Sequence, residues 1–403
     1  MARKDSRGRN LRTGERQREN GLYEYRYNDP VTGKRDSIYH EDLSGLREME
    51  KDIQRKLDDG IHTDAETRKM DVNTLFERYI EARKLADQTR ENYIRMWNCH
   101  VKDEIGRMKV VEVRPSHVKL FYARLSKADY SRSTIKLLHD MLYPAFEMAV
   151  DDDIIRKNPC KMALRDFGRD PEAREAITND QQEKLLAFVR DSNVYNVYFP
   201  MLVIMIGTAC RCGEIIGLTW SDIDMKNKQV SITHQLIYKN LGEGSRLCVT
   251  TPKTEAGIRD IPMTASVRKA FEKQREYQFM MGIDRDYEID GMKGFIFTSK
   301  NGRPLQPSAV NNVLYNIVDA YNKQEAAKAK KEHRKPEMMP RISAHILRHT
   351  GCTRMAERGM DVKVLQYIMG HANIAVTMEV YNHITEYARI EKEILKMEDL
   401  MVV

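Results

Sequence analysis

Apolar and polar residues alternate near the start of the chain, and the apolar period then lengthens to that of a helix. The alternating segment places aromatic residues on one strand face and charged residues on the other: Tyr23, Tyr25 and Tyr27 against Glu24 and Arg26. A turn-forming run at 29–33 separates this strand from a second strand expected at 34–40. Apolar residues then recur at helical spacing up to Gly60, at Leu43, Leu46, Met49, Ile53 and Leu57. We therefore expect residues 1–67 to form a small antiparallel sheet with one helix over one face, and we assign this sheet as three-stranded.

The next segment, residues 71–158, has the period of amphipathic helices throughout. One helix begins with Leu75, Phe76, Tyr79 and Ile80, and residues 89–101 form a second. Pro115 suits the first turn of another helix, and Ser131 or Ser133 can cap the one that follows. This pattern predicts a bundle of four or five short helices.

A linker rich in proline, glycine and charge is expected at 159–175, before a third domain at 176–384. Thr178 and Gln181 form a capping-box pattern at its start. Residues 198–218 predict a buried helix, a break at 207–212, and a new helix near Gly213. Alternating segments at 229–238, 246–251 and 258–263 predict one small antiparallel sheet. The fold class is thus multidomain α+β, with a mainly helical third domain.

The third domain holds the residues with the clearest catalytic chemistry. Arg211 lies at the predicted helix break, where its planar fork can bind two phosphate oxygens and Glu214 can orient it. His345 and Arg348 are three residues apart, so one helix face presents both. His371 follows a break at Gly370. Taken singly, an arginine at a helix junction is more often structural, so the inference depends on the whole set.

Tyr381 and Lys253 complete this candidate set. Asn373 can cap the helix that carries Tyr381, and its phenol could attack a phosphodiester once deprotonated, since the free pKa is about 10. Lys253 lies near a predicted turn, where its ammonium could protonate a leaving 5′ oxygen, although a lysine in a turn is usually only solvated. Two arginines could neutralise the phosphate in the transition state as metal ions do in nucleases.

Charge and composition agree with a polyanionic partner. The 403 residues carry 67 lysines and arginines against 60 acidic residues, a formal net charge of +7. Basic residues concentrate before position 19, which predicts either a basic arm or a solvated tail. Candidate DNA-contacting residues in the first two domains, each of which could equally be solvated surface charge, are Arg26, Lys34, Arg35, Arg90, Arg95, Arg132 and Lys136.

Several other classes of protein are not favoured. Cys210 with Cys212, or His345 with His349 and Cys352, could begin a metal site, but no further ligands follow at suitable spacing, so we expect no metal. The six scattered cysteines are expected to be reduced thiols. No stretch approaches a membrane span and the N-terminus lacks a signal peptide's apolar core, so we expect a cytoplasmic protein.

The candidate set resembles that of a known family. In order and approximate spacing, Arg211, Lys253, His345-x-x-Arg348, Gly370-His371 and Tyr381 are similar to the Arg-Lys-His-x-x-Arg-His-Tyr residues of tyrosine recombinases of the lambda-integrase family. The layout of a basic sheet domain, a helical domain and this domain looks most like integrases of conjugative transposons. One difference is that the family usually reads TGLR at the first arginine, where this chain has Thr208-Ala209-Cys210-Arg211.

The resemblance implies site-specific integration and excision of a mobile element through a 3′-phosphotyrosyl intermediate on Tyr381, with no metal or nucleotide cofactor. It implies that domain 1–67 binds arm-type sites, while domains 71–158 and 176–384 clamp double-stranded DNA at the crossover core site. It further implies a homotetramer, an accessory excisionase as a candidate partner, and a C-terminal helix at 385–403 for protomer contacts, although packing in cis is an equal alternative.

Three other functions use related features. A type IB topoisomerase shares the chemistry, but it does not need the first domain or the C-terminal helix. A housekeeping resolvase of chromosome dimers lacks the residues before Asp71. A catalytically inactive DNA-binding regulator is disfavoured because all six polar positions are present.

Overall fold

The computed structural model describes residues 3–28, 33, 35–58, 69–161, 163–164, 167–169, 175–240, 244–252 and 254–382. Its contacts divide the chain into two units, Met1–Glu172 and Ala173–Val403. Within these described ranges, no helix is both long enough and apolar enough to cross a membrane.

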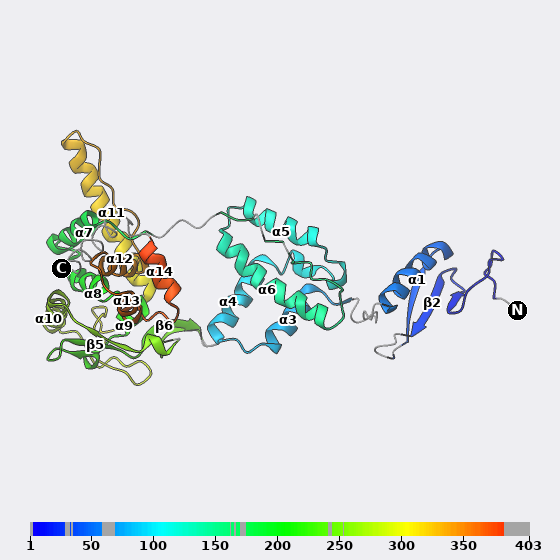
Figure 1. The fold of residues 1–403 in the computed structure, drawn as a ribbon, viewed down its shortest axis with the longest axis horizontal. Helices are drawn as coiled ribbons and strands as arrows, with labels where there is room; N and C mark the ends of the chain where they lie inside the picture. Colours follow the sequence, from blue (N-terminus) through cyan, green and yellow to red (C-terminus); the bar gives the residue numbers. More distant parts are fainter. Residues whose placement is uncertain are drawn as a thin grey trace, which may run out of the picture. The chain divides into compact units, whose positions relative to one another are not determined.

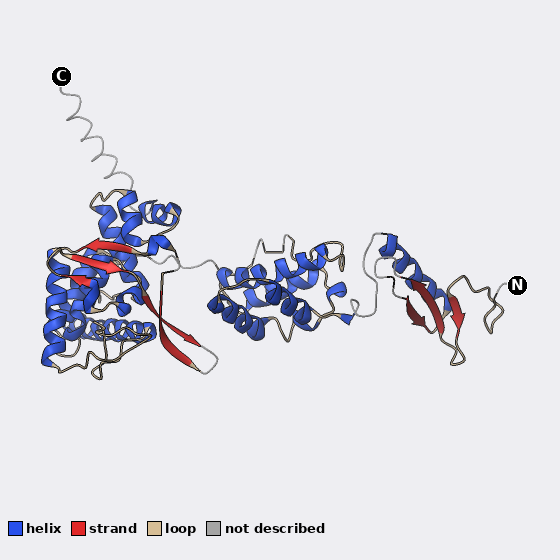
Figure 2. Ribbon diagram, turned by 90° about the horizontal axis from the view of Figure 1, so that it is seen from below, coloured by secondary structure: helices blue, strands red, loops and turns tan. Residues whose placement is uncertain are grey.

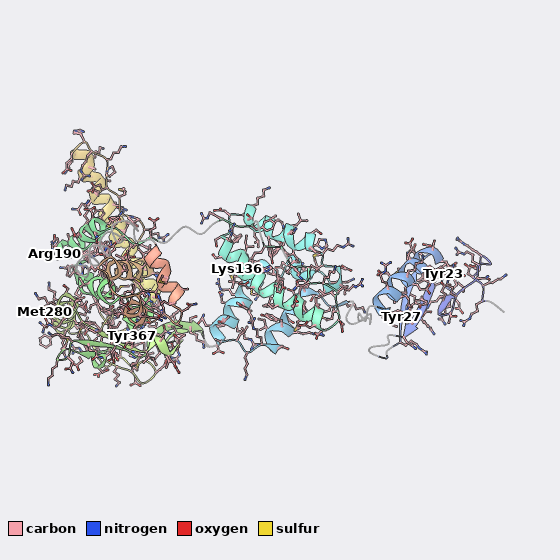
Figure 3. The ribbon with its side chains drawn as sticks, viewed as in Figure 1. Tyr23, Tyr27, Lys136, Arg190, Met280 and Tyr367 are labelled. Atoms are coloured by element: carbon pink, nitrogen blue, oxygen red, sulfur yellow. The ribbon has the colours of Figure 1, made fainter. Side chains whose placement is uncertain are left out.

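The first unit begins with an antiparallel sheet covered by a helix (Figure 1). Its strands, in spatial order, are β1 (Glu15–Gln17), β2 (Tyr23–Asn28) and β3 (Arg35–His40). Helix α1 (Leu43–Asp58) packs on β2 and β3. Tyr23 and Tyr27, labelled in Figure 3, are buried beneath it with Ile38 and Leu46. The predicted three-stranded sheet with one helix is therefore confirmed.

Residues 3–14 fold back on this sheet instead of extending as an arm. The carboxylate of Asp5 accepts hydrogen bonds from the Arg9 backbone N–H and Nε, each at 2.7 Å, and from the Tyr23 hydroxyl at 2.9 Å. These bonds hold the pKa of Asp5 at about 2, because together they outweigh the effect of burial. The buried carboxylate of Asp5 thus orders a segment for which the charge pattern alone allowed either a basic arm or a solvated tail.

The rest of the first unit is a helical bundle. Its α-helices are α3 (Val72–Ala82), α4 (Asp87–His100), α5 (Pro115–Lys127) and α6 (Arg132–Asp151). Asp71 caps α3 by accepting from the Thr74 N–H, Pro115 occupies the first turn of α5, and Ser131 caps α6. Phe76 and Trp97 stack in the core with ring centroids 3.8 Å apart. The predicted bundle is confirmed.

Part of the expected linker packs onto this bundle. Cys160 and Ala163 are buried in the bundle core, and Phe167 contacts the Tyr122 ring edge-on at 6.2 Å. The Arg132 N–H donates to the carbonyl of Arg169 at 2.8 Å. The described residues of this segment therefore pack on the bundle as far as residue 169.

The second unit is mainly helical. Its α-helices are α7 (Asn179–Asp191), α8 (Phe199–Thr208), α9 (Cys212–Gly217), α10 (Ala265–Met280), α11 (Pro307–Lys331), α12 (Ala344–Glu357), α13 (Val362–Met369) and α14 (Ile374–Asn382). The helix break expected at 207–212 is confirmed, as is the Thr178 capping box of α7.

The strands of this unit form two small sheets instead of the single sheet predicted (Figure 2). One sheet has the order β4 (Ile223–Asp224), β5 (Gln229–Ile232) and β8 (Arg259–Pro262), and the other pairs β6 (Gln235–Asn240) with β7 (Ser245–Thr250). The predicted strand at 229–238 is therefore two strands. It breaks at residues 233–234, where the buried ring of His234 bonds through Nε2 to the Gly217 carbonyl at 2.8 Å.

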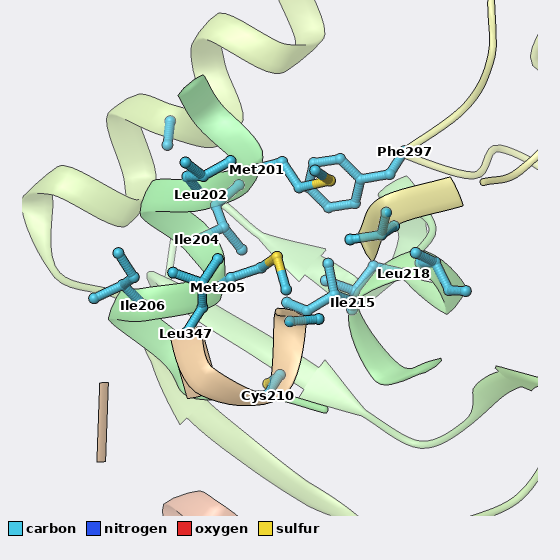
Figure 4. Close-up of a cluster of buried hydrophobic side chains, with 14 of the residues drawn as sticks. Met201, Leu202, Ile204, Met205, Ile206, Cys210, Ile215, Leu218, Phe297 and Leu347 are labelled. Carbon is cyan, nitrogen blue, oxygen red and sulfur yellow. The ribbon is translucent and has the colours of Figure 1, made fainter. Parts of the chain in front are cut away.

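Helix α8 lies at the centre of this unit. Its residues Met201, Leu202, Ile204 and Met205 are almost fully buried and pack in one cluster with side chains from distant parts of the chain (Figure 4). Among these is Leu347 of α12, which fixes that helix beside the end of α8. The core thus joins α12, which carries His345 and Arg348, to the helix that ends shortly before Arg211.

Candidate active site

Arg211 lies at the turn between α8 and α9. Ala209 adopts a left-handed conformation with φ of 50°, so the chain reverses and Arg211 becomes the residue before α9. Its backbone N–H donates to Glu214 Oε2 at 2.9 Å, and Nη1 donates to Oε1 at 2.7 Å. Nη2 donates to the carbonyl oxygen of Gly370 at 3.0 Å. The side chain remains 41% exposed, so Glu214 orients a guanidinium that an anion can still reach.

Arg348 approaches the same turn from α12 and is nearly buried. Its Nη1 donates to the Ala209 carbonyl at 2.8 Å, and Nη2 donates to the Met369 carbonyl at 2.6 Å. Burial first, and then the neighbouring charge of Arg211, lowers the pKa of Arg348 to about 10. The group is still protonated at neutral pH, and its carboxylate partner Glu214 lies 4.0 Å away, at the limit of an ion pair. An anion bound here would relieve this unbalanced positive charge.

His371 completes the cluster. Its Nε2 lies 3.0 Å from Nη2 of Arg348, and its Nδ1 lies 2.9 Å from Oγ1 of Thr377. Because a guanidinium can only donate, Nε2 is the acceptor and Nδ1 carries the proton. Burial, followed by the charges of Arg348 and Arg211, lowers the pKa of His371 to about 4. The ring is therefore neutral at physiological pH.

A buried ion pair between Glu214 and Arg259 helps to fix the positions of these residues. Glu214 and Arg259 are 1% and 0% exposed, and Nη2 of Arg259 donates to Glu214 Oε2 at 2.9 Å. Arg259 also donates from Nε to the Ile368 carbonyl at 2.6 Å and from Nη1 to the Gly257 carbonyl at 2.8 Å. Burial raises the pKa of Glu214, but the bond and charge of Arg259 outweigh this effect, so the net shift is downward.

The sequence reasoning missed Arg259. The sequence did contain a signal, because Arg259 lies on the same face of its strand as Ile261 and Met263, which are both buried. A charged residue on the inward face of a predicted strand implies a buried partner, and here that partner is Glu214.

The structure describes the other predicted catalytic residues to different extents. His345 is exposed on α12, one turn before Arg348. Tyr381 belongs to the last turn of α14, and the predicted cap is confirmed because the Ala375 N–H donates to Asn373 Oδ1 at 2.9 Å. The side chain of Tyr381 lies outside the described part of the structure, and so does the whole of Lys253.

The candidate DNA-contacting residues lie in the first unit. All those within the described ranges are exposed: Arg26, Arg35, Arg90, Arg95, Arg132 and Lys136. Lys136, on α6, is labelled in Figure 3. Lys34 lies outside the described residues. Exposure is necessary for a DNA contact, and the contact itself stays a prediction for each of them.

Potential metal ligands do not assemble in the part of the chain that the structure describes. There, no group of three or more histidine, cysteine, aspartate or glutamate residues is placed to hold an ion. Cys210, next to Arg211, instead places its sulfur 3.7 Å from Nη2 of Arg259.

Comparisons with known proteins identify relatives over nearly the whole chain. Residues 175–387 match the model of the phage integrase family, and residues 1–57 match that of the DNA-binding domain of Tn916 integrase. The chain is 33% identical to the transposase from transposon Tn916 of Enterococcus faecalis, over 97% of both chains. It is 23% identical to the ICEBs1 integrase of Bacillus subtilis strain 168, over 95% of this chain and 98% of that one.

Solved structures give the same relationship. The Tn1549 transposon integrase in complex with a circular intermediate DNA superposes with a TM-score of 0.70 at 33% identity, over 81% of this chain and 99% of that one. A lambda integrase tetramer bound to a Holliday junction has a TM-score of 0.52 at 17% identity, over 92% and 95% of the two chains. The second similarity concerns the fold alone.

Proposed function

The chain belongs to the phage integrase family of tyrosine recombinases and is a DNA strand-transferase, and on that premise we propose that Tyr381 is its nucleophile and that Arg211, Lys253, His345, Arg348 and His371 assist it. The substrate we propose is the end of a mobile element, a conjugative transposon, which the protein integrates and excises.

One observation carries this proposal. Arg211, at the turn before α9, and Arg348, in α12, are far apart in the sequence, yet their Nη2 atoms donate to the consecutive carbonyls of Gly370 and Met369. The next residue is His371, whose Nε2 touches the same nitrogen of Arg348. Two guanidinium groups and one neutral imidazole therefore surround a single turn, which makes a site for one tetrahedral anion such as a phosphodiester.

The proposed reaction follows from these groups. The phenolic oxygen of Tyr381 forms a bond to phosphorus, the bond from phosphorus to the 5′ oxygen breaks, and Lys253 gives that oxygen a proton. Arg211 and Arg348 stabilise the negative charge of the pentacoordinate phosphate. A partner strand's 5′ hydroxyl then attacks the 3′-phosphotyrosyl group and releases the phenol, so the bond energy is conserved without ATP.

His371 and His345 have different proposed roles. His371 is neutral, so its Nε2 can accept the phenolic proton from Tyr381 during attack once it gives up its hydrogen bond from Arg348. His345 lies three residues before Arg348 on α12, and it adds a donor to the phosphate beside that arginine.

The remaining parts of the chain have proposed partners of their own. The sheet domain 1–67 binds arm-type sites, and the helical domain 71–158 binds the core site together with the catalytic domain 176–384, joined by the segment 159–175. Residues 385–403 contact a neighbouring protomer in a homotetramer on DNA. We also propose that an accessory excisionase sets the direction of exchange. The protein would act in the cytoplasm, where that DNA lies.

The test uses a nicked duplex that carries the element's end, incubated in EDTA without ATP. The wild-type chain should form a covalent adduct with the 3′ end of the cleaved strand on a denaturing gel, and Tyr381→Phe should form none. Arg348→Ala should bind the duplex but accumulate little adduct, since a transition-state charge loses its partner.

The outcomes separate the alternatives. Tight binding without any adduct from the wild-type chain would favour the inactive regulator. Relaxation of a supercoiled plasmid that lacks the element's ends would favour the topoisomerase, and recombination confined to chromosomal dimer sites would favour the housekeeping resolvase.

A further inference from the structure

One charged residue of the N-terminal sheet is buried on the face opposite α1. Glu24 lies on the central strand β2, on the opposite side from Tyr23 and Tyr25, and only 1% of its side chain is exposed. Its neighbours across the sheet are Arg16 of β1 and Tyr39 of β3. A carboxylate in this position must be compensated by the side chains that cover it.

Three arginines provide that compensation. Nε of Arg16 lies 2.6 Å from Glu24 Oε2, Nε of Arg18 lies 3.1 Å from the same oxygen, and Nε of Arg26 lies 3.0 Å from Oε1. The hydroxyl of Tyr39 donates to Oε1 at 3.3 Å and accepts from Nη2 of Arg18 at 3.2 Å. Arg18 also donates from Nη2 to Oε1 at 3.4 Å and so binds the carboxylate through two nitrogens, whereas Arg16 and Arg26 approach it through Nε.

This cluster is more than a stabilising ion pair. One carboxylate beneath three guanidiniums leaves two positive charges in excess, and the arginine side chains are 38–47% exposed. Burial raises the pKa of Glu24, but the bonds from Arg18 and Arg26 outweigh it and bring the pKa to about 2, so the carboxylate stays ionised. The carboxylate fixes the positions of three guanidinium groups that otherwise repel one another.

We infer that Glu24 is a specificity-determining residue of this sheet: it holds Arg16, Arg18 and Arg26 in one geometry that reads a DNA sequence, and it weakens binding to all other sequences. The inference rests on the proposed binding of arm-type DNA by this domain. A fork that pairs with guanine O6 and N7 must be held in place, because a mobile side chain loses its entropy on binding. The carboxylate also lowers the local positive charge, which drives sequence-independent binding to phosphates.

The charge effect and the geometric effect oppose each other, which makes the inference testable. Glu24→Gln removes the negative charge and releases the arginines. Binding to unrelated DNA should tighten, with a steeper dependence on salt, while binding to the preferred sequence weakens. A charge effect alone would tighten both. Glu24→Asp keeps the charge but withdraws the carboxylate by one methylene, so unrelated binding should stay unchanged while specific binding falls.

The experiment begins by finding the probe. The full chain and a variant with Arg16, Arg18 and Arg26 all changed to alanine each enrich duplexes from a random-sequence pool. Sequences that only the unmodified chain enriches depend on this face and become the specific probe, and a scrambled duplex of equal length is the unrelated one. If both proteins enrich the same sequences, the face does not read DNA. That result removes the premise, and it is distinguishable from a failure at Glu24.

Affinities for both duplexes are then measured over a range of salt concentrations. For Glu24→Gln and Glu24→Asp the ratio of unrelated to specific Kd should fall about tenfold, comparable to the loss of one guanine contact. Glu48→Gln, an equal charge change at an exposed position on α1, should leave the ratio unchanged. A ratio within about twofold of wild type in Glu24→Asp, or tighter binding of both duplexes by Glu24→Gln, would overturn the inference.

Discussion

Replacing Arg259 by methionine should destabilise the second unit more than most single substitutions do. Methionine retains an unbranched apolar stem like that of arginine, but it lacks all the hydrogen-bond donors of the Arg259 guanidinium. Glu214 would lose its fully buried partner at 2.9 Å, and the Ile368 and Gly257 carbonyls would lose bonds of 2.6 and 2.8 Å.

The magnitude follows from the burial of the pair. Removing one member of a buried ion pair costs about 3–5 kcal/mol, because the other charge is left uncompensated. Arg211 still contacts Glu214 at 2.7 Å, which limits the loss to the lower part of that range. We expect the free energy of unfolding to fall by about 3 kcal/mol and the melting temperature of this unit by roughly 10 °C.

The two tryptophans allow the units to be followed separately. Trp97 lies in the helical bundle and Trp220 in the second unit, so a Trp97→Phe background leaves Trp220 to report the unfolding that matters. Urea unfolding of this background is compared with Arg259→Met, Glu214→Gln and the double variant. The double variant should be more stable than the sum of the single effects by about 2 kcal/mol, since neither charge is then left alone.

Two results would refute this reasoning. A loss below about 1 kcal/mol in Arg259→Met would mean that solvent already screens the pair. Strict additivity in the double variant would mean that Arg259 and Glu214 act independently.

Three further predictions concern the same unit. His371, with a folded pKa of about 4 against an unfolded value near 6.5, should titrate near pH 4 by imidazole NMR. Because its folded pKa is depressed, its contribution to stability is complete above pH 6.5 and is lost as the pH falls toward 4. A measured pKa near 6.5 would contradict this. Gly370→Ala should cost about 1–2 kcal/mol in urea unfolding and slow adduct formation, because φ is 60° and the new Cβ would lie 3.0 Å from Nη1 of Arg259; unchanged stability would show that the turn relaxes freely. Asp290→Ala should speed hydrogen exchange of the Val249 amide about fivefold, since the carboxylate accepts from that N–H at 2.9 Å; an unchanged exchange rate would mean that β7 does not depend on this bond.

The sequence by itself determined the local elements and the order of the candidate residues. Alternation at Tyr23–Tyr27 and helical spacing at Leu43–Leu57 depend only on neighbours a few residues away, so the sheet and its covering helix were predictable. The helix break at Arg211 and the cap at Asn373 are signalled locally in the same way. The candidate catalytic set was proposed from its order and spacing, and its roles stay predictions.

Only the tertiary structure decided which groups meet. The buried packing of α8 against α12 brings Arg348 to the Ala209 carbonyl, and the turn at Gly370 adds His371, although no local pattern links these positions. The same is true of Arg259, whose partners Glu214 and Ile368 come from two distant segments, and of the strand break at His234, which a bond to Gly217 fixes. Periodicity records which face of an element is buried, whereas pKa values and ion pairs depend on what lies across that face, and distant segments supply those neighbours.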